Sequence, residues 1–424
     1  MEALTLFKKT MKADTQENVS VKVCMHVRGV ARTDGRVLRE ASALVEAGCA
    51  VTIVDIEHDL SRPAEEDMDG VRLVHLLKPH WFIPPHSTAR RFIRSLGKLI
   101  STTVKLLQVS ADVYHAHDDN TLLPCYIAAR WRRKPLVFDA HEMPLSWLES
   151  MAWRPLRALL MCFFTHLLQY CAGVITVSPP IAEAIREYYR VSSVTLVRNV
   201  LAYRQVAKSD RLRQLLELTS ETRIALYQGN LQADRGLELL VHAAAYLREN
   251  IVLVLMGKNI GNAQTQLEAL ISTKKVGNRV KLLAPVPYQE LLDWTASADV
   301  GLIVYESDSA NIRWCLPNKL FEYLMAGLPV LASSLEAVEE IITMYAVGRI
   351  IPSLTPAEVG AAINAILADS ASLEYMHQNA LCVVQSELCW ERESQQLIKL
   401  YQRLLKTGRD EAALLLNRSE LTIR

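Results

Sequence analysis

The sequence predicts an α/β protein built from two halves, each with a parallel sheet. Short apolar strands alternate with segments of helical period along nearly the whole chain, which is the pattern of repeated strand–helix–strand units. A polar segment, residues 202–222, interrupts this alternation near the middle. The chain has 424 residues, of which 50% are hydrophobic and 22% charged, so it is long enough to form two ordinary cores.

Four segments follow from this division. We expect a polar arm over residues 1–20, a first domain over 21–203, a second domain over 204–388, and a C-terminal helix with a tail over 389–424. The two halves resemble each other in pattern, but the sequence contains no short internal repeat.

Composition and charge exclude several classes of protein. A net charge of +1 is too small for a protein that binds nucleic acid with its whole surface. The eight cysteines form no CxxC pair and lie mostly within apolar runs, so we expect reduced core residues in a cytoplasmic protein. The first twenty residues lack the apolar segment of a signal peptide, which also argues against secretion.

The first strand–helix–strand unit lies at the start of the first domain. Residues 21–27 (VKVCMHV) and 51–56 are the expected strands. Between them Asp34 can cap a helix, and Gly48 ends it. No GxGxxG motif follows the first strand, so the sequence does not predict a dinucleotide-binding site there.

A basic amphipathic helix is predicted next. No acidic residue occurs between positions 70 and 111, whereas basic residues recur from Arg90 to Lys105. The apolar side carries Phe92, Leu96, Leu99, Thr103 and Leu106, and the basic side carries Arg91, Arg94, Lys98 and Lys105. Such a helix, with WFI at 81–83 just upstream, suits an anionic membrane surface. The alternative is an ordinary surface helix with a solvated basic face.

Two strands of the first domain end in polar clusters. Residues 112–120 (DVYHAHDDN) and 135–144 (PLVFDAHEMP) have this pattern. Polar residues just past the carboxyl ends of parallel strands line a ligand crevice. We therefore expect convergence of His117, Asp118, Asp139, His141 and Glu142. A metal site is the competing interpretation, but no recognisable ligand spacing favours it.

The segment that follows tests whether the protein crosses a membrane. Residues 158–182 contain no Asp, Glu, Lys or Arg, and an uncharged stretch of this length could form a transmembrane helix. Thr165, His166 and Gln169 interrupt it, so we expect a buried helix and then a buried strand instead. A further helix begins near Ser178, and residues 194–200 (VTLVRNV) are the expected last strand of the first domain.

The second domain repeats the strand and helix pattern. Strands are expected within residues 224–230, 251–257, 280–286 and 300–306. After them, residues 316–333 (LPNKLFEYLMAGLPVLAS) predict a helix, a stop at Gly327 and a short buried strand. Lys319 and Glu322 lie in the first turn of this otherwise apolar helix, where the helix N-terminus favours an anion. The alternative is a buried helix whose two charges reach solvent.

A second cation lies at a comparable place. Arg235 and Gly236 begin a helix after the first strand of the second domain, as Lys319 does later. An arginine beside a helix cap is by itself more often a surface residue. Two cations at helix starts that follow strands suit a diphosphate leaving group, whose negative charge must be stabilised.

The chain as a whole resembles a family of enzymes. The motifs DGRVLREASALVEAG, YHAHD, LVFDAHE, VITVS, YQGNLQADRGLELLV and LPNKLFEYLMAGLPV occur in this order. Together they are similar to the retaining, sugar-nucleotide-dependent glycosyltransferases of family 4. The resemblance covers residues 21–404. It implies the GT-B fold, with two Rossmann-like doubly wound domains facing a central cleft, and a last helix that crosses back to the first domain.

The resemblance also implies roles for individual residues. Glu322 matches the second glutamate of the family's Glu-x7-Glu pattern, which binds the donor ribose. Arg235 matches the cation beside the donor diphosphate, with Lys319 as a second one, and His117 matches a histidine near the transferred sugar. The implied donor-binding residues are Gly229, Asn230, Arg235, Gly257, Val286, Asn318, Lys319 and Glu322. The implied acceptor-side residues are Arg28, Asp118, His141 and Glu142.

The implied activity is transfer of a sugar from a nucleotide-sugar to a lipid-linked, glycan or small-molecule acceptor, with catalysis by His117, Arg235, Lys319 and Glu322. We expect synthesis of cell-envelope polysaccharide or glycoconjugate, no cofactor and no metal. The protein would be cytoplasmic, with possible attachment to the inner membrane surface. Asp118 and Glu142 would orient His117.

Two positions depart from the family pattern. Trp314 replaces the first glutamate of the Glu-x7-Glu pair, and Asn230 replaces the usual arginine. These departures leave two alternatives, a nucleotide-sugar epimerase of the same fold and a non-catalytic partner subunit of a glycosyltransferase. A DxD sequence at 67–69 precedes Gly70 and is expected to form a turn.

Overall fold

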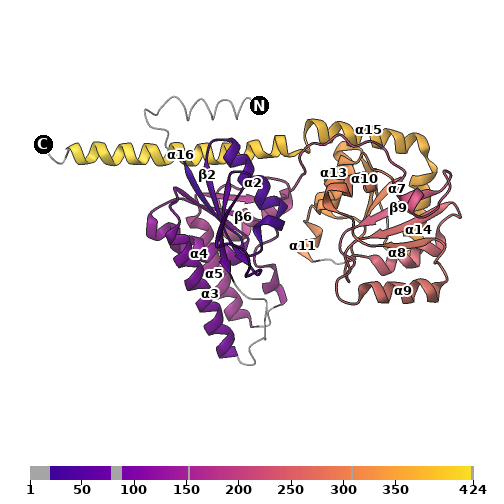
Figure 1. Cartoon of the computed structure of the whole chain (residues 1–424), viewed down its shortest axis with the longest axis horizontal. Coiled ribbons are helices and arrows are strands. Elements are labelled where there is room, and N and C mark those ends of the chain that lie inside the picture. Colours follow the sequence, from indigo (N-terminus) through magenta and orange to yellow (C-terminus); the bar gives the residue numbers. More distant parts are fainter. Residues whose placement is uncertain (1–19, 78–87, 151–152, 307–308, 422–424) are drawn as a thin grey trace. The chain divides into compact units, whose positions relative to one another are not determined.

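The computed structural model describes residues 20–77, 88–150, 153–306 and 309–421, which form two compact units (Figure 1). Unit 1 contains the described residues up to Val197 together with those from Ser394 on, and unit 2 runs from Arg198 to Glu393. Both units are α/β, which confirms the predicted fold class. The polar arm predicted over residues 1–20 lies outside the described residues as far as residue 19.

Unit 1 is built on an eight-stranded sheet of order β3-β4-β2-β1-β5-β6-β7-β8. Its strands are β1 Lys22–His26, β2 Ala50–Glu57, β3 Glu65–Met68, β4 Val71–Leu77, β5 Val113–His117, β6 Leu136–Ala140, β7 Gly173–Thr176 and β8 Thr195–Leu196. Its helices are η1 Ala31–Thr33, α2 Gly35–Glu46, α3 Thr88–Gln108, α4 Asp119–Arg132, η2 Ser146–Ser150, α5 Arg154–Tyr170, α6 Pro179–Tyr189 and α16 Trp390–Leu421, of which the part from Ser394 on belongs to this unit.

The predicted first strand–helix–strand unit is confirmed. Asp34 caps α2 by accepting hydrogen bonds from the backbone N–H groups of Arg36 and Val37. The helix ends before Gly48, whose φ of +97° is a left-handed conformation that glycine adopts without steric cost. β1 then pairs in parallel with both β2 and β5, so it lies in the middle of the sheet.

The sheet contains one antiparallel strand that the sequence did not predict. β3 pairs with β4 through a tight turn in which Asp69 and Gly70 both have positive φ. The DxD sequence was expected to be a turn, but Asp67 and Met68 belong to β3 and only Asp69 lies in the turn. Asp67 Oδ1 accepts a hydrogen bond from the N–H of Gly70, so this carboxylate stabilises the turn.

Two predictions for the end of unit 1 need correction. Helix α5, which carries no charged residue after Arg157, is buried along one side only, through Phe164, Leu167 and Leu168, whereas Leu159 and Phe163 are exposed. Among the described helices, none is sufficiently long and apolar to cross a membrane. The strand predicted over residues 194–200 is shorter, since only Thr195–Leu196 pair with β7 before the chain leaves the sheet.

Unit 2 is built on a six-stranded sheet of order β11-β10-β9-β12-β13-β14, in which every described pairing is parallel. Its strands are β9 Arg223–Gln228, β10 Ile251–Met256, β11 Val280–Leu283, β12 Val300–Ile303, β13 Val330–Ala332 and β14 Gly348–Ile350. Its helices are α7 Arg211–Leu215, α8 Leu237–Ala243, η3 Ala244–Tyr246, α9 Ala263–Lys274, η4 Tyr288–Glu290, α10 Leu291–Thr295, α11 Ala310–Arg313, α12 Asn318–Met325, α13 Glu336–Tyr345, α14 Pro356–Ala368 and α15 Ser370–Ser386.

The helix predicted after residue 316 is α12, and its apolar stripe is buried as expected. Leu320, Phe321, Leu324 and Met325 pack in the core of unit 2. The helix ends before Gly327, whose φ is +69°, and β13 follows. Lys319 and Glu322 therefore lie on a helix that is held in place by its buried apolar side chains.

Each sheet reverses its strand order at one place. In unit 1 the strands run outward from β1 to β2, β4 and the edge strand β3 on one side, and from β5 to β8 on the other. In unit 2 they run outward in succession from β9 and from β12. Ligands of doubly wound sheets bind at the carboxyl ends of the strands at such a reversal. Each unit therefore has one such place, β1/β5 in unit 1 and β9/β12 in unit 2.

Candidate functional site

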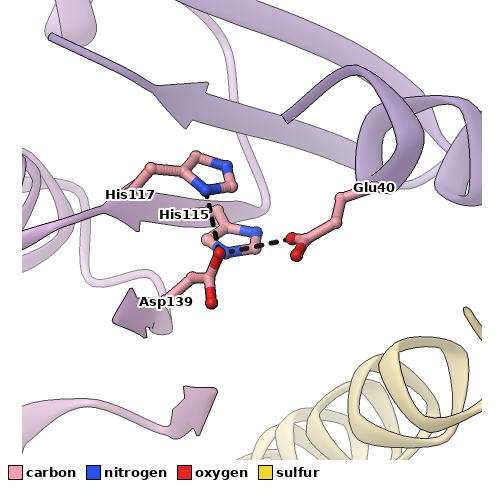
Figure 2. A group of neighbouring side chains, drawn as sticks. All are labelled: Glu40, His115, His117 and Asp139. Carbon is pink, nitrogen blue, oxygen red and sulfur yellow. Dashed lines mark hydrogen bonds and ion pairs between the residues drawn. The ribbon is translucent and has the colours of Figure 1, made fainter. Parts of the chain in front are cut away.

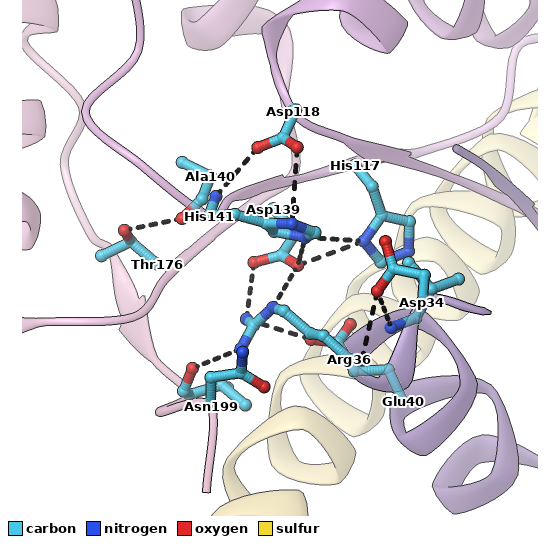
Figure 3. Close-up of polar contacts among 12 residues, drawn as sticks. Asp34, Arg36, Glu40, His117, Asp118, Asp139, Ala140, His141, Thr176 and Asn199 are labelled. Carbon is cyan, nitrogen blue, oxygen red and sulfur yellow. Dashed lines mark hydrogen bonds and ion pairs between the residues drawn. The ribbon is translucent and has the colours of Figure 1, made fainter. Parts of the chain in front are cut away.

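The polar cluster of unit 1 lies at the carboxyl ends of β5 and β6, next to the strand reversal. His117 is the last residue of β5, and the parallel register pairs it with Asp139 of β6. His141 follows β6 by one residue. The structure therefore brings together four of the five side chains that were expected to converge, since His117 and His141 both contact Asp139 and Asp118 contacts His141 (Figure 3).

Asp139 is the centre of this cluster. Arg36, from the first turn of α2, donates two hydrogen bonds to it, from Nε to Oδ2 at 2.8 Å and from Nη2 to Oδ1 at 2.7 Å. His117 Nδ1 lies 3.1 Å and His141 Nε2 lies 2.8 Å from the same Oδ2 atom. Arg36 also donates from Nη1 to the carbonyl of Val197 at 2.9 Å, which locks the guanidinium in place.

The charges of the cluster are set by this pairing. Burial opposes ionisation of Asp139, but Arg36 and then His141 hold the pKa of its carboxyl well below the usual range. Burial likewise opposes the charge on His141, but Asp139 raises the pKa of this imidazole to about 9. At neutral pH Asp139 is therefore a carboxylate and His141 an imidazolium.

Two further buried groups lie behind His117. The ring of His115 stacks on that of His117, with centroids 4.4 Å apart, and its Nδ1 lies 2.9 Å from the hydroxyl of Tyr401 on α16. Burial and then His117 hold the pKa of His115 well below its usual range, so its ring is neutral. Glu40 is buried 3.0 Å from Arg36 Nη2, and burial followed by Asp139 raises the pKa of its carboxyl to about 7.

This cluster has the composition of a metal site. Glu40, His115, His117 and Asp139 each place a ligand atom within 4.8 Å of the others (Figure 2). However, the guanidinium of Arg36 lies against both carboxylates and already supplies the positive charge that a cation would bring. We therefore describe it as an ion-paired network, and the expectation that the protein needs no metal stays a prediction.

The prediction of which residues orient the His117 ring needs correction. Asp118 and Glu142 were expected to orient it, but Asp139 does so, because it lies in the neighbouring strand at the paired position. Asp118 faces His141 instead, accepting a hydrogen bond from its backbone N–H at 3.2 Å, and has a φ of +65° that is unfavourable for a residue with a side chain. Glu142 is exposed. Arg28 donates to Asn120 Oδ1 at 2.6 Å.

The predicted cations of unit 2 lie close to the β9/β12 reversal. Lys319 Nζ lies 3.6 Å from the ring centre of Tyr227 and 5.8 Å from that of Tyr305. The guanidinium carbon of Arg235 lies 5.1 Å from the same Tyr305 ring, so both cations share one aromatic neighbour. The structure thus brings together two residues that are far apart in sequence.

Lys319 is held in an unusual state. It is buried, although it begins a helix near the surface. Burial and then the charge of Arg235 lower the pKa of its ammonium to about 7, from an ordinary value of 10.5. An anion bound beside this ammonium would favour its charged form, which burial and Arg235 disfavour.

Glu322 is oriented by a residue that the sequence did not identify. Gln228, the last residue of β9, donates from Nε2 to Glu322 Oε2 at 2.5 Å. Its Oε1 accepts from Thr295 Oγ1 at 2.7 Å, which determines the direction of the amide. Gln228 is buried, so this chain of three side chains holds Glu322 in one direction.

The glycines predicted to bind the donor lie where two loops touch. A Cβ on Gly257 would stand 1.6 Å from the carbonyl oxygen of Gly229, so no side chain fits there. Gly229 itself has a φ of +129° and lies beside the Lys319 ammonium. Asn230 accepts a hydrogen bond from Tyr227 through its carbonyl.

The remaining predicted donor residues, Asn318 and Val286, also belong to unit 2. Asn318 Oδ1 accepts a hydrogen bond from Asn199 Nδ2 at 2.8 Å, and Val286 packs against the core. Beside the Arg235 loop lies a cavity of about 170 Å³, lined among others by Asp234, Glu238 and Glu306. Its carboxylates are suitable acceptors for hydroxyl groups.

Several residues of these networks were missed at the level of sequence. Arg36 and Glu40 form a charged pair four positions apart within the apolar face of α2, and this spacing was a readable signal. No such signal marks Gln228, Tyr227 and Tyr305, because each looks like an ordinary strand residue until its partners are known.

Two family models match the chain. The one for Glycosyltransferase Family 4 matches residues 34–201, and the one for Glycosyl transferases group 1 matches residues 208–381. The chain is 24% identical over 380 residues to an uncharacterized glycosyltransferase of Methanocaldococcus jannaschii, covering 85% of this chain and 91% of that protein. It is 26% identical over 387 residues to the D-inositol 3-phosphate glycosyltransferase of Pseudarthrobacter chlorophenolicus, covering 85% and 87%.

The fold also matches solved structures. HepE of Anabaena, solved in complex with UDP, superposes with a TM-score of 0.70 at 16% identity, covering 90% of this chain and all of that one. At this identity the likeness shows a common fold and nothing about ligands.

Proposed function

Because the chain belongs to the family 4 glycosyltransferases and has the GT-B fold, we propose that unit 2 binds a nucleotide-diphosphate sugar and that His117 of unit 1 contacts the transferred sugar or the incoming hydroxyl. The activity is that of a glycosyltransferase. Trp314 and Asn230, which differ from the family pattern, leave the cations and the oriented glutamate in place.

The observation that carries this proposal is the pair formed by Arg235 and Lys319. Two cations that repel each other at the strand reversal of a doubly wound sheet form a site for a polyanion. A diphosphate bound there restores the full charge of Lys319. As the bond to the sugar breaks, negative charge grows on the leaving phosphate, and both cations stabilise it.

Glu322 is assigned to the ribose of the donor. Its carboxylate accepts hydrogen bonds, and Gln228 holds it one helical turn from Lys319. UDP is the first nucleotide to test, because HepE was solved with it. The transfer would retain the anomeric configuration and use no metal, as the family resemblance implies. Determining the anomeric configuration of the product by NMR tests the first point.

The acceptor is assigned to a glycan or lipid-linked molecule of envelope glycoconjugate synthesis, reached at an anionic membrane surface. Support comes from α3, where Leu96, Ile100 and Val104 are exposed at a spacing of four residues, while Lys98 and Lys105 lie on another side of the same helix. The side chains before residue 95, among them Arg90, lie outside the described part of the chain. Of the residues predicted on the apolar side of this helix, Leu96 is exposed, whereas Thr103 and Leu106 are buried.

The test is the change in melting temperature with UDP, GDP, ADP, TDP and CMP. A ligand that binds only the folded state raises the free energy of unfolding, by about 2.7 kcal/mol when its concentration is a hundred times Kd. The melting temperature rises as a consequence. We expect a shift with one diphosphate and its loss in Glu322→Ala. Glu268→Ala, an exposed glutamate on α9 of the same unit, is the matched control and should keep the shift. No shift with any of the five would contradict the donor site.

A further inference from the structure

We propose that Asp139 is a positioning residue that holds His117 in the Nδ1–H tautomer, so that His117 Nε2 accepts a hydrogen bond from a hydroxyl of the substrate. This inference rests on the proposed function for the identity of that substrate. It concerns a carboxylate that neither the sequence motifs nor the family pattern assigned to this role.

The tautomer follows from the chemistry of the contact. A carboxylate accepts hydrogen bonds and donates none, so the His117 Nδ1 atom, 3.1 Å from Asp139 Oδ2, must carry the proton. The other neighbour of Nδ1 is His141 Nε2, at 3.3 Å. His141 lies between the carboxylates of Asp139 and Asp118 and is an imidazolium, which offers no acceptor to His117.

The carboxylate itself is unable to rotate. Arg36 binds both of its oxygens, and the guanidinium is tied in turn to the carbonyl of Val197. A bidentate pair of this kind imposes a plane on the carboxylate. The position of Oδ2, and with it the direction of the His117 ring, is therefore set from α2.

The ring of His117 is held on its other sides as well. The neutral ring of His115 stacks on it at an interplanar angle of 18°, and His141 meets it edge-on with centroids 5.5 Å apart. The ionisable groups around it come from several elements. They are Arg36 and Glu40 of α2, His115 of β5, Asp118 just after β5, Asp139 of β6, His141 just after β6, and Tyr401 of α16. None of these donates to Nε2 among the described residues.

The Nε2 atom is consequently a buried acceptor without a partner. The side chain of His117 is 1% exposed, and its Nε2 makes no hydrogen bond within the described chain. Buried polar atoms in native proteins are nearly always paired, so an unpaired one points to a ligand. In this tautomer the ligand group must be a donor, which an alcohol is and a phosphate or carbonyl group is not.

The direct test is NMR of the full chain with ¹⁵N-labelled histidine at pH 7.5, without ligand. Correlations between ring protons and ring nitrogens distinguish the two neutral tautomers and the imidazolium, and His117→Gln identifies the signals of His117. We expect a protonated Nδ1 and a bare Nε2. A proton on Nε2, in either a neutral or a charged ring, would overturn the proposal.

A variant tests the role of Asp139. In Asp139→Asn the amide can donate to Nδ1, so the proton should move to Nε2 and kcat should fall about 100-fold or more, as when the wrong tautomer is fixed in other histidine–aspartate pairs. The melting shift with UDP, which reports on unit 2, should persist. An unchanged tautomer or an unchanged kcat in this variant would contradict the role of Asp139.

Asp55→Asn is the matched control. Asp55 is also buried in the sheet of unit 1 and also pairs with a histidine, His75 at 2.5 Å, outside the cluster. It should lose stability but keep its kcat and the tautomer of His117. If Asp139→Asn does not fold, the spectrum of the wild-type chain decides by itself. If no nucleotide binds the wild type, the proposed function fails while the tautomer remains measurable.

Discussion

At the scale of single residues, the chemistry of this protein depends on charges that the fold places in unfavourable surroundings. Lys319 is buried beside another cation, and Asp139 is buried among four nitrogen donors from three side chains. Both arrangements cost stability unless a partner compensates the charge. In unit 1 Arg36 compensates the charge of Asp139. In unit 2 we assign the compensation of the Lys319 charge to the donor diphosphate.

Binding of a diphosphate should therefore depend on pH through Lys319. In the protein without ligand this ammonium loses its proton near pH 7, whereas a bound diphosphate favours the protonated form. The affinity for UDP should fall as the pH rises from 7 to 9, by up to about tenfold per pH unit. Calorimetry in buffers of different ionisation enthalpy should show proton uptake on binding. Lys319→Arg, which stays charged, should bind without this pH dependence.

The stability of the unliganded protein should change in the opposite direction. The unfolded chain keeps the Lys319 proton up to about pH 10.5, while the folded protein loses it above about pH 7. The unfolded state thus binds more protons in this window, and this group makes the free energy of unfolding rise with pH. Comparing urea melts of wild type and Lys319→Met isolates the contribution. An equal pH slope in both would contradict the lowered pKa.

At the scale of elements, helix α3 combines packing with a surface that the core does not use. Thr102, Thr103 and Leu106 face the interior, whereas Leu96, Ile100 and Val104 are exposed on successive turns. Exposed apolar residues at this spacing, on a helix that also carries basic residues, are typical of helices that lie on a membrane surface. If this side of α3 faced only water, its exposed apolar side chains would cost free energy that no contact recovers.

Sedimentation with vesicles tests this surface. Wild type should bind vesicles containing phosphatidylglycerol more tightly than pure phosphatidylcholine, and salt should weaken the binding. Leu96→Ser with Ile100→Ser should reduce binding about tenfold or more, since both lose buried apolar area. Met344→Ser, on an exposed position of α13 in unit 2, is the control and should bind as wild type does. Equal binding by the double variant would exclude α3 as the contact.

At the scale of the whole molecule, unit 1 is assembled from both ends of the chain. The part of α16 from Ser394 on belongs to it, with Leu397, Ile398 and Tyr401 buried. Tyr401 reaches His115 in the centre of the sheet, and Leu400 packs beside Gly173. The first unit is therefore incomplete until the last helix has been made.

Changes in α16 should destabilise unit 1 selectively. Ile398→Ala should lower the free energy of unfolding of this unit by about 2–5 kcal/mol, the usual cost of such a cavity. The neighbouring exposed Lys399→Ala should change it by less than about 0.5 kcal/mol. Calorimetry can assign the transitions, because UDP should raise only that of unit 2. A shift of the unit 2 transition by Ile398→Ala would contradict this division.

The sequence by itself determined the parts of this protein that depend on local signals. The cap at Asp34, the stop at Gly327, the alternation of strands and helices outside residues 65–77 and the burial of α12 were all readable, because periodicity and glycine placement act over a few residues. The same signals carried the resemblance and, with it, the assignment of Lys319 and Arg235. The positions of candidate site residues at strand ends also follow from a parallel sheet.

Only the tertiary structure decided how these residues are paired. Arg36 and Asp139 are 103 positions apart, and Gln228 and Glu322 are 94 apart. Such contacts depend on which strands become neighbours and on their register, which local patterns do not encode. For the same reason the sequence assigned His117 to Asp118 and Glu142, its neighbours along the chain, and missed the carboxylate that lies beside it in the adjacent strand.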